Sequence, residues 1–342
     1  MAIITELVVE TRGAFIGKFQ GRLQVRVNNE VVQQAPIMHL EQVIITGKAV
    51  SLSSDVIEAC AEEGIPIHFV DGLGRAYANL YAAGLTGTVQ TRRAQLLAYS
   101  TGRGMQLAVA MAMAKLGNQA ALLRYLVKNR KESEPELYQA VKLIALEVEE
   151  PQADLARLGQ SGQVVEVGRL SLMGFEGQAA QRYWHGVRQV VQVGDWPGRV
   201  GRGATDPTNS ALNYGYGILY GQIERAIVLA GLDPYAGFIH ADRPGKPSLV
   251  LDLIEEFRQP IVDRSIFALL NLGAAIEVDE AGQLTEGAKK AIVGRVLERL
   301  DKAEKYEGKS VPLKQIIQCQ ARHVATFLRG DRAEYEGFEV KW

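Results

Sequence analysis

The sequence predicts an α+β protein, with a small, mainly antiparallel β domain over residues 1–84 and a larger all-α domain over residues 85–342. Apolar residues alternate with a period of two up to about residue 81, and after Gly84-Leu85-Thr86-Gly87 they recur with a period of 3.6. The chain has 342 residues, of which 47% are hydrophobic and 23% charged, so it is long enough for two domains. This composition excludes disordered and collagen-like proteins.

The clearest element of the β domain is a hairpin. Leu23, Val25 and Val27 alternate with polar residues, which places them on one buried face. Asn28-Asn29 then supplies two residues that tolerate the positive φ of a tight turn. We therefore predict two antiparallel strands on either side of this turn.

A short helix and three further strands complete the predicted β domain. The helix begins at Asp55 with a capping box to Glu58, and Gly64 follows its end as the left-handed residue. His68 alternates with apolar neighbours and is predicted to be packed in the core. The further strands are expected at residues 43–45, 67–70 and 76–81.

In the helical domain the best-defined element starts at Asp206-Pro207, an N-cap residue followed by proline in the first turn. Its apolar positions continue to about residue 230, and Gly231 and Pro234 then end it. The length of about 25 residues predicts a central helix of a bundle.

Cysteine content and the N-terminus predict a cytoplasmic protein. Cys60 and Cys319 are the only cysteines, and they form no closely spaced pair for a zinc site. No basic leader precedes an apolar core, and no uncharged apolar run reaches the ~18 residues that cross a bilayer. We expect no association with a membrane.

Positive charge is concentrated in the middle of the chain, although the net charge is only −1. Between Asp71 and Glu132 there are nine cations and no acid, and a second cluster surrounds residues 182–202. One interpretation is that these cations pair with acidic segments or keep the surface solvated. The other is a track that binds the phosphates of DNA. Charge alone leaves both open.

Glu176 and His240 lie in unusual local surroundings. Gly174 and Gly177 flank Glu176 within a helical pattern, where each interior glycine costs about 0.5–1 kcal/mol relative to alanine. Either close helix packing or a ligand explains their presence. His240 ends an apolar run before a loop rich in proline and glycine, where most histidines are merely polar surface.

Asp252 and Glu255 are three residues apart and share one face of a helix that starts near Ser248. Such pairs are common on solvated faces. If these acids meet His240 and Glu176 in space, the result is an oxygen-rich site with one imidazole. Mg²⁺ and Mn²⁺ prefer such donors, and the chemistry implied is phosphoryl transfer.

Five sequence blocks in the helical half stand in a distinctive order and spacing. The blocks are Met173-Gly174-Phe175-Glu176-Gly177 with Tyr183-Trp184; Asp206-Pro207-Thr208-Asn209 with Tyr214-Gly215-Tyr216; Gly231-Leu232-Asp233-Pro234 with Gly237-Phe238-Ile239-His240; the run from Ser248 to Arg258; and Val262-Asp263-Arg264. These blocks resemble the CRISPR-associated endonuclease family that acts as the integrase in spacer acquisition, and the β-then-α layout is similar throughout.

The resemblance implies a metal-dependent DNA endonuclease and integrase that uses Mg²⁺ or Mn²⁺. Glu176, His240 and Glu255 match the family's metal ligands, and Asp252 matches a neighbouring acid that supports the site. Alternatively, Asp252 only caps the helix that begins near Ser248. The resemblance also implies DNA as a partner, a homodimer formed through the β domains, and assembly with a small ferredoxin-like CRISPR-associated protein.

In this reading, a 3′ hydroxyl of the incoming DNA attacks a phosphodiester at the boundary of a repeat. Two sets of residues are candidates for the DNA surface. Aromatic residues at 183, 184, 214 and 216 either stack on bases or belong to the core. The candidates for phosphate contacts are Arg92, Arg93, Arg103, Arg182 and Arg202.

Three rival functions remain open at this point. The first is a metal-dependent nuclease that processes branched DNA in repair, with the same ligands. The second is a non-catalytic DNA-binding scaffold, for which the candidate ligands are dispensable. The third is an enzyme that acts on small molecules, which predicts no salt-dependent affinity for DNA.

Overall fold

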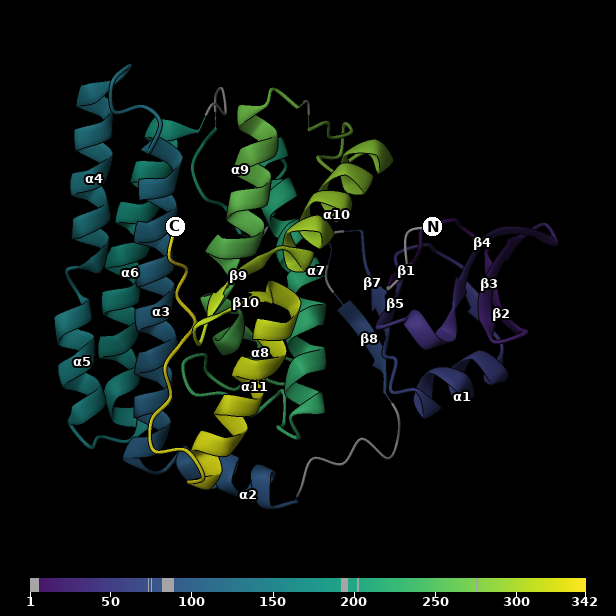
Figure 1. Cartoon of the computed structure of the whole chain (residues 1–342), viewed down its shortest axis with the longest axis horizontal. Coiled ribbons are helices and arrows are strands. Elements are labelled where there is room, and N and C mark those ends of the chain that lie inside the picture. The colour runs from purple at the N-terminus through teal and green to yellow at the C-terminus, as the bar shows by residue number, and fades with distance from the viewer. Residues whose placement is uncertain are drawn as a thin grey trace. The chain divides into compact units, whose positions relative to one another are not determined.

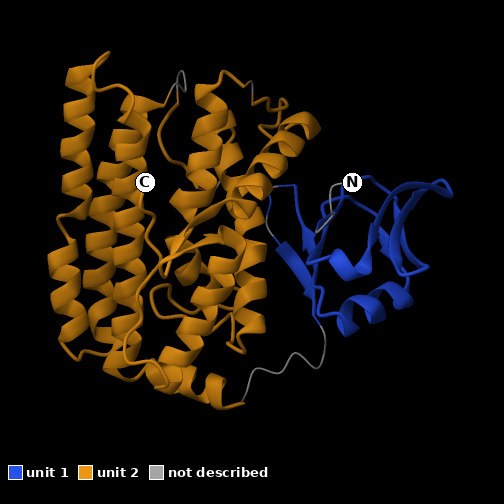
Figure 2. Ribbon diagram, viewed as in Figure 1, with its two compact units in different colours: residues 1–86 blue, residues 87–342 orange. Residues whose placement is uncertain are grey.

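The computed structural model describes residues 6–72, 74, 76–81, 89–191, 196–201, 203–274 and 276–342. The chain forms two compact units, Met1–Thr86 and Gly87–Trp342 (Figure 2). The change of period predicted a boundary close to this division, and residues 82–88 themselves lie outside the described residues.

The described part of the N-terminal unit holds two four-stranded sheets and one α-helix around an apolar core (Figure 1). In the first sheet, β1 pairs in parallel with β5, β5 in parallel with β7, and β7 antiparallel with β8. In the second, β3 pairs antiparallel with β4 and β2, and β2 pairs in parallel with β6. The bounds are β1 Glu6–Val9, β5 Gln42–Ile45, β7 Ile67–Val70 and β8 Ala76–Leu80 in the first sheet, and β4 Glu30–Pro36, β3 Arg22–Val27, β2 Phe15–Phe19 and β6 Ser51–Leu52 in the second, with the 3-10 turn η1 at Ile37–His39.

The predicted hairpin is confirmed as β3 and β4, with φ of +50° at Asn28 and +66° at Asn29. The N-cap of helix α1 (Ser54–Glu62) is Ser53, two residues before the predicted Asp55. Gly64 has φ of +67°, as its predicted place after the helix requires. The strand pairing is mixed rather than mainly antiparallel, because β1, β5 and β7 come together through connections that the period of two does not reveal.

In the residues that the structure describes, the C-terminal unit is mostly helical but also holds a β-hairpin, so the expectation of an all-α domain needs that correction. Strands β9 (Ala303–Tyr306) and β10 (Lys309–Pro312) form this antiparallel hairpin. The helices are α2 Val89–Ala98, α3 Gly102–Val127, α4 Pro135–Glu149, α5 Gln152–Gln160, α6 Val165–Val190, α7 Pro207–Leu229, α8 Ser248–Leu253, the 3-10 turn η2 Ile254–Glu256, the π-helix η3 Arg258–Asp263, α9 Arg264–Asn271, α10 Glu286–Asp301 and α11 Leu313–Arg329.

The predicted central helix is confirmed as α7. The Asp206 carboxylate accepts a hydrogen bond of 2.8 Å from the Asn209 backbone N–H, and Pro207 is the first helical residue. Gly231 follows the helix with φ of +79°.

Helix α3 lies beside α4 and α6, as Figure 1 shows. Its buried residues are spread over several faces of the helix. It also contacts η2 and η3, so the segments that carry the candidate site residues are packed against one long helix. Among the described residues, none of the helices has the length and apolar character needed to cross a bilayer.

Candidate active site

Two of the predicted ligands, Glu176 on α6 and Glu255 on η2, meet at the ammonium group of Lys115 on α3. Lys115 Nζ donates a hydrogen bond to Glu176 Oε1 and lies 2.7 Å from Glu255 Oε2. All three side chains are largely buried. Packing of α3 against α6 and η2 therefore brings together two acids that are far apart in the sequence.

Arg258 provides a second positive charge next to Glu255. Its Nε lies 3.1 Å from Glu255 Oε1, one turn further along the chain. Burial by itself raises the pKa of the Glu255 carboxyl, but the charges of Arg258, Lys115 and His240 outweigh burial and lower that pKa to about 2. Glu255 is thus held as a carboxylate. His240 lies close enough for its charge to lower the pKa of Glu255.

The Asp252 carboxylate fixes both the loop and the ring of His240. It accepts backbone hydrogen bonds from Phe238, Ile239 and His240 at 2.5, 3.0 and 2.9 Å. It also lies 2.7 Å from His240 Nδ1. Gly237 permits this approach, since a Cβ there would lie 2.7 Å from Asp252 Oδ2.

These contacts decide between the two roles considered for Asp252. It lies in the last turn of α8 and its carboxylate binds the preceding loop, so the interpretation as an N-cap of that helix is wrong. With Nδ1 engaged by a carboxylate, Nε2 of His240 is the nitrogen left to act as a ligand or proton carrier.

Carboxylates and an imidazole are the donor types that a divalent cation such as Mg²⁺ or Mn²⁺ takes. Two carboxylates already converge on one cationic nitrogen, and the imidazole carries the carboxylate partner that metal-binding histidines usually have. Glu255 Oε2 is buried and, despite its nearness to Lys115, accepts no well-aligned hydrogen bond within the described part of the chain. Over the same residues, no group of three His, Cys, Asp or Glu side chains is arranged so that it could hold a metal ion. The ammonium of Lys115 now neutralises the carboxylates.

A second buried carboxylate, Asp263 at the end of the π-helix η3, organises the aromatic residues behind Arg258. Tyr183 donates to its Oδ2 at 2.6 Å, and Tyr216 donates to its Oδ1. Burial raises the pKa of Asp263 to about 6. The Arg258 guanidinium lies 4.6 Å from the centre of the Tyr216 ring, so this network supports the arginine that binds Glu255.

The aromatic residues at 183, 214 and 216 belong to the core, which confirms the core interpretation for them. Tyr183 is 0% exposed, Tyr214 2% and Tyr216 8%. Trp184 is partly buried against the same core. Base stacking by the three tyrosines is excluded by their burial.

The two glycines beside Glu176 are not explained by packing within the chain. A Cβ at Gly174 or Gly177 would meet no atom within 4 Å, and both residues are exposed on α6. Close helix packing, one of the two explanations considered for them, is therefore wrong for the described structure. The backbone of α6 beside Glu176 stays open on that side.

The predicted phosphate-binding arginines have different surroundings. Arg92 and Arg93 on α2 are exposed. Arg103 donates to the Phe327 carbonyl at 2.9 Å and stacks on its ring, and Arg182 pairs with Glu150 at 2.8 Å, so both have intramolecular roles. Arg202 lies outside the described residues.

Sequence reasoning missed three residues of the site. Lys115 was counted only as one cation of a basic run, and nothing local distinguishes it from its neighbours. Arg258 stands three residues after Glu255, and that spacing on a helical face was a usable signal for an ion pair. Asp263 gave no sign of its burial beyond its place among apolar residues.

Comparison with known proteins agrees with this architecture. The family model for CRISPR associated protein Cas1 matches residues 7–298. CRISPR-associated endonuclease Cas1 1 of Archaeoglobus fulgidus is 37% identical over 98% of this chain and 99% of its own length. Two solved structures share the fold: a casposase bound to integration product, with TM-score 0.81 and 23% identity over 99% of this chain and 96% of that one, and a Cas6-RT-Cas1–Cas2 complex, with TM-score 0.73 and 20% identity over 99% and 37%. The chain belongs to the Cas1 family of CRISPR-associated proteins.

Proposed function

We propose that this protein is a divalent-metal-dependent DNA endonuclease and integrase that inserts short foreign DNA segments into a CRISPR repeat array. The observation that carries the proposal is the convergence of Glu176 and Glu255 on one buried cation, next to a histidine held by Asp252. Membership of the Cas1 family supports it, as do the name of the Archaeoglobus relative and the integration product bound by the casposase.

Each residue has a distinct task in this proposal. Glu176, His240 and Glu255 would hold Mg²⁺ or Mn²⁺, and the bound ion would offset negative charge on phosphodiester oxygens and lower the pKa of a coordinated hydroxyl. Asp252 orients the imidazole of His240 and fixes its tautomer. Arg258 and Lys115 keep Glu255 ionised in its buried position.

The reaction is a transesterification at phosphorus. The 3′ hydroxyl of the incoming strand forms a new P–O bond, the bond at the repeat boundary breaks, and the departing oxygen leaves as a new 3′ hydroxyl. The attacking hydroxyl loses a proton and the departing oxygen gains one, so the two DNA substrates suffice and no oxidant is needed. The same site with water as nucleophile gives the endonuclease activity.

We extend the proposal to the partners of the protein. A solved Cas6-RT-Cas1–Cas2 complex shares the fold of this chain, which supports assembly with a second CRISPR-associated protein. We propose that this partner is small and ferredoxin-like. We propose that the N-terminal unit forms the homodimer contact and that Arg92 and Arg93 on α2 bind DNA phosphates.

The test compares strand transfer into a repeat array with cleavage of branched DNA, both with Mn²⁺ and with EDTA. The proposal expects metal-dependent strand transfer that Glu176→Ala and His240→Ala abolish. Cleavage of branched DNA without strand transfer would favour a repair nuclease. Full activity of both variants would indicate a non-catalytic scaffold.

Affinity for DNA is tested separately with the Arg92→Glu, Arg93→Glu double variant. Each lost phosphate contact removes roughly one unit from the slope of log K against log salt, so the slope is expected to fall by up to about 2. The matched control is Arg182→Glu, because Arg182 already pairs within the chain. An unchanged slope in the double variant would place α2 away from the duplex.

A further inference from the structure

The C-terminal residues 335–340, which we call the strap, lie without regular structure along α3. A Cβ on Gly337 would lie 2.6 Å from Ala114 Cβ, and a Cβ on Gly117 would lie 2.7 Å from the Glu339 carboxylate. Asn118 Nδ2 donates to the Phe338 carbonyl at 2.7 Å, and Val340 N donates to Asn118 Oδ1 at 2.9 Å. The strap therefore contacts α3 closely, as the yellow C-terminal trace in Figure 1 shows.

The strap is tied to Glu256, the residue after Glu255. Tyr335 donates to Glu256 Oε1 at 2.5 Å, and the Phe338 backbone N–H donates to Oε2 at 2.9 Å. Gln320 on α11 adds a third hydrogen bond, to Oε2, at 2.9 Å. Glu256 is fully buried, so these bonds account for a carboxyl group that would otherwise be costly to bury.

Contacts with the strap also fix the backbone at this point. Asn118 Nδ2 donates to the Glu256 carbonyl at 2.8 Å as well as to the strap. The Phe257 ring stacks on Phe338 with centroids 5.4 Å apart. Because the peptide unit is planar, holding residues 256 and 257 in place limits the direction in which Glu255 points.

Helix α3 thus contacts both Glu255 and Glu256. Lys115 of α3 contacts Glu255, and Asn118, one turn further along α3, holds Glu256. Asn118 thus links the strap to Glu256, the residue bonded to the proposed metal ligand Glu255.

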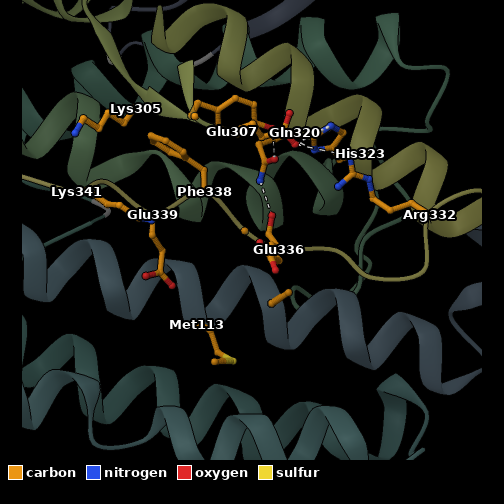
Figure 3. Close-up of a pocket in the computed structure, with 14 residues that line it drawn as sticks. Met113, Lys305, Glu307, Gln320, His323, Arg332, Glu336, Phe338, Glu339 and Lys341 are labelled. Carbon is orange, nitrogen blue, oxygen red and sulfur yellow. Dashed lines mark hydrogen bonds and ion pairs between the residues drawn. The ribbon is translucent and has the colours of Figure 1, made fainter. Parts of the chain in front are cut away.

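On one side, part of the strap borders open space. Beside it lies a cavity of about 550 Å³, lined by the strap, the β9–β10 hairpin, α11 and α3 (Figure 3). In Figure 3 Gln320 reaches the strap at Glu336, next to Phe338. The strap has room to shift toward this cavity if a contact with α3 is lost.

We propose that the strap is a positioning element for Glu255, acting through Glu256 to keep the Glu255 carboxylate aimed at the site where the divalent cation binds. This inference rests on the proposed metal-dependent function. It predicts that loosening the strap weakens cation binding without any change to the ligands themselves.

The experiment measures the Kd for Mn²⁺ by isothermal titration calorimetry on the full chain, together with thermal stability. Gly337→Ala pushes the strap away from Ala114, and we expect Mn²⁺ affinity to fall about tenfold, as for other changes behind a metal ligand. Tyr335→Phe removes only the hydroxyl bonded to Glu256 and is expected to produce a smaller loss in the same direction.

The matched control is Ile292→Val, which lowers stability from a buried position on α10 and should leave the Kd unchanged. Wild-type affinity in both strap variants would overturn the inference, while Mn²⁺ binding by the wild type would still support the proposed function. Failure of the wild type to bind Mn²⁺ would reject the proposed function, and the inference with it. If Gly337→Ala does not fold, Tyr335→Phe decides.

Discussion

Glu255 and Glu256 are adjacent and buried, yet their carboxyl groups lie in opposite environments. Glu255 faces Lys115 and Arg258, and despite burial these charges lower its pKa to about 2. Glu256 faces uncharged donors, and burial raises its pKa to about 7. The two consecutive acids therefore differ in role. Glu255 stays charged in the candidate site, and Glu256 connects η2 with α11 and the strap through hydrogen bonds.

Of the changes to these two acids, Glu255→Ala is expected to have the largest effect. Loss of a proposed ligand should reduce strand transfer by about a thousandfold or more, because several kcal/mol of charge stabilisation are lost. Affinity for DNA, measured by fluorescence anisotropy, should stay nearly unchanged. Normal integration by this variant would remove Glu255 from the ligand set.

Lys115→Met removes the charge on which Glu255 and Glu176 converge. Breaking a buried ion pair leaves uncompensated charge, so the free energy of unfolding in EDTA should fall by about 3–5 kcal/mol. Added Mn²⁺ should restore more stability to this variant than to the wild type. The control is Arg124→Met, whose more exposed pair with Glu149 should contribute less than about 1 kcal/mol. Equal losses in the two variants would contradict the prediction.

The contrast between the two acids also predicts opposite responses to pH. The folded protein keeps the proton of Glu256 up to about pH 7, whereas the unfolded chain releases it near 4.5, so stability falls as pH rises through this window. The loss amounts to about 3 kcal/mol. Glu255 acts in the reverse sense, because its pKa is lower in the folded protein. Its contribution to the free energy of unfolding is lost as pH falls from 4.5 to about 2.

Glu256→Gln should therefore flatten the decline between pH 4.5 and 7 in urea unfolding with EDTA present. Asp263→Asn is the comparison, because burial raises the pKa of that acid from 3.8 to about 6 and its window lies lower. A wild-type profile in Glu256→Gln would show that Glu256 ionises normally in the folded protein.

The smallest expected effect concerns the open side of α6 beside Glu176. Gly174→Ala and Gly177→Ala should each raise the free energy of unfolding by about 0.5–1 kcal/mol, because no neighbouring atom opposes a Cβ. Gly294→Ala on α10 has the same open surroundings and should stabilise equally. If DNA approaches α6, the Gly174→Ala and Gly177→Ala variants should lose affinity for DNA and the Gly294→Ala variant should not. Equal DNA affinities in the three variants would leave Gly174 and Gly177 unexplained.

Local signals predicted the parts of the structure that depend on neighbouring residues. The Asn28-Asn29 turn, the Asp206 cap and the glycines after α1 and α7 follow from backbone preferences within a few positions. The proposed ligands came from a family resemblance. The structure adds that Glu176 and Glu255 meet, which spacing alone left open.

The contacts that sequence reasoning missed depend on long-range packing. Lys115 and Glu176 are 61 residues apart on two helices, and neither helix shows which of its residues will face the other. The parallel pairing of β1 with β5 and the strap along α3 are similar cases. Tyr335, Phe338 and Val340 of the strap are buried in the core, but their spacing follows neither a helical nor a strand period.

Asp252 shows how narrowly chemistry limits one position. Its two oxygens receive three backbone N–H groups, and His240 Nδ1 lies within hydrogen-bond distance of one of them. Asparagine has the same shape but would turn an NH₂ group toward these donors, and glutamate would carry its oxygens one methylene further into a space that Gly237 already leaves tight. Among the twenty amino acids, aspartate alone combines the required reach and acceptors, so this position has almost no freedom to vary while the loop keeps its form.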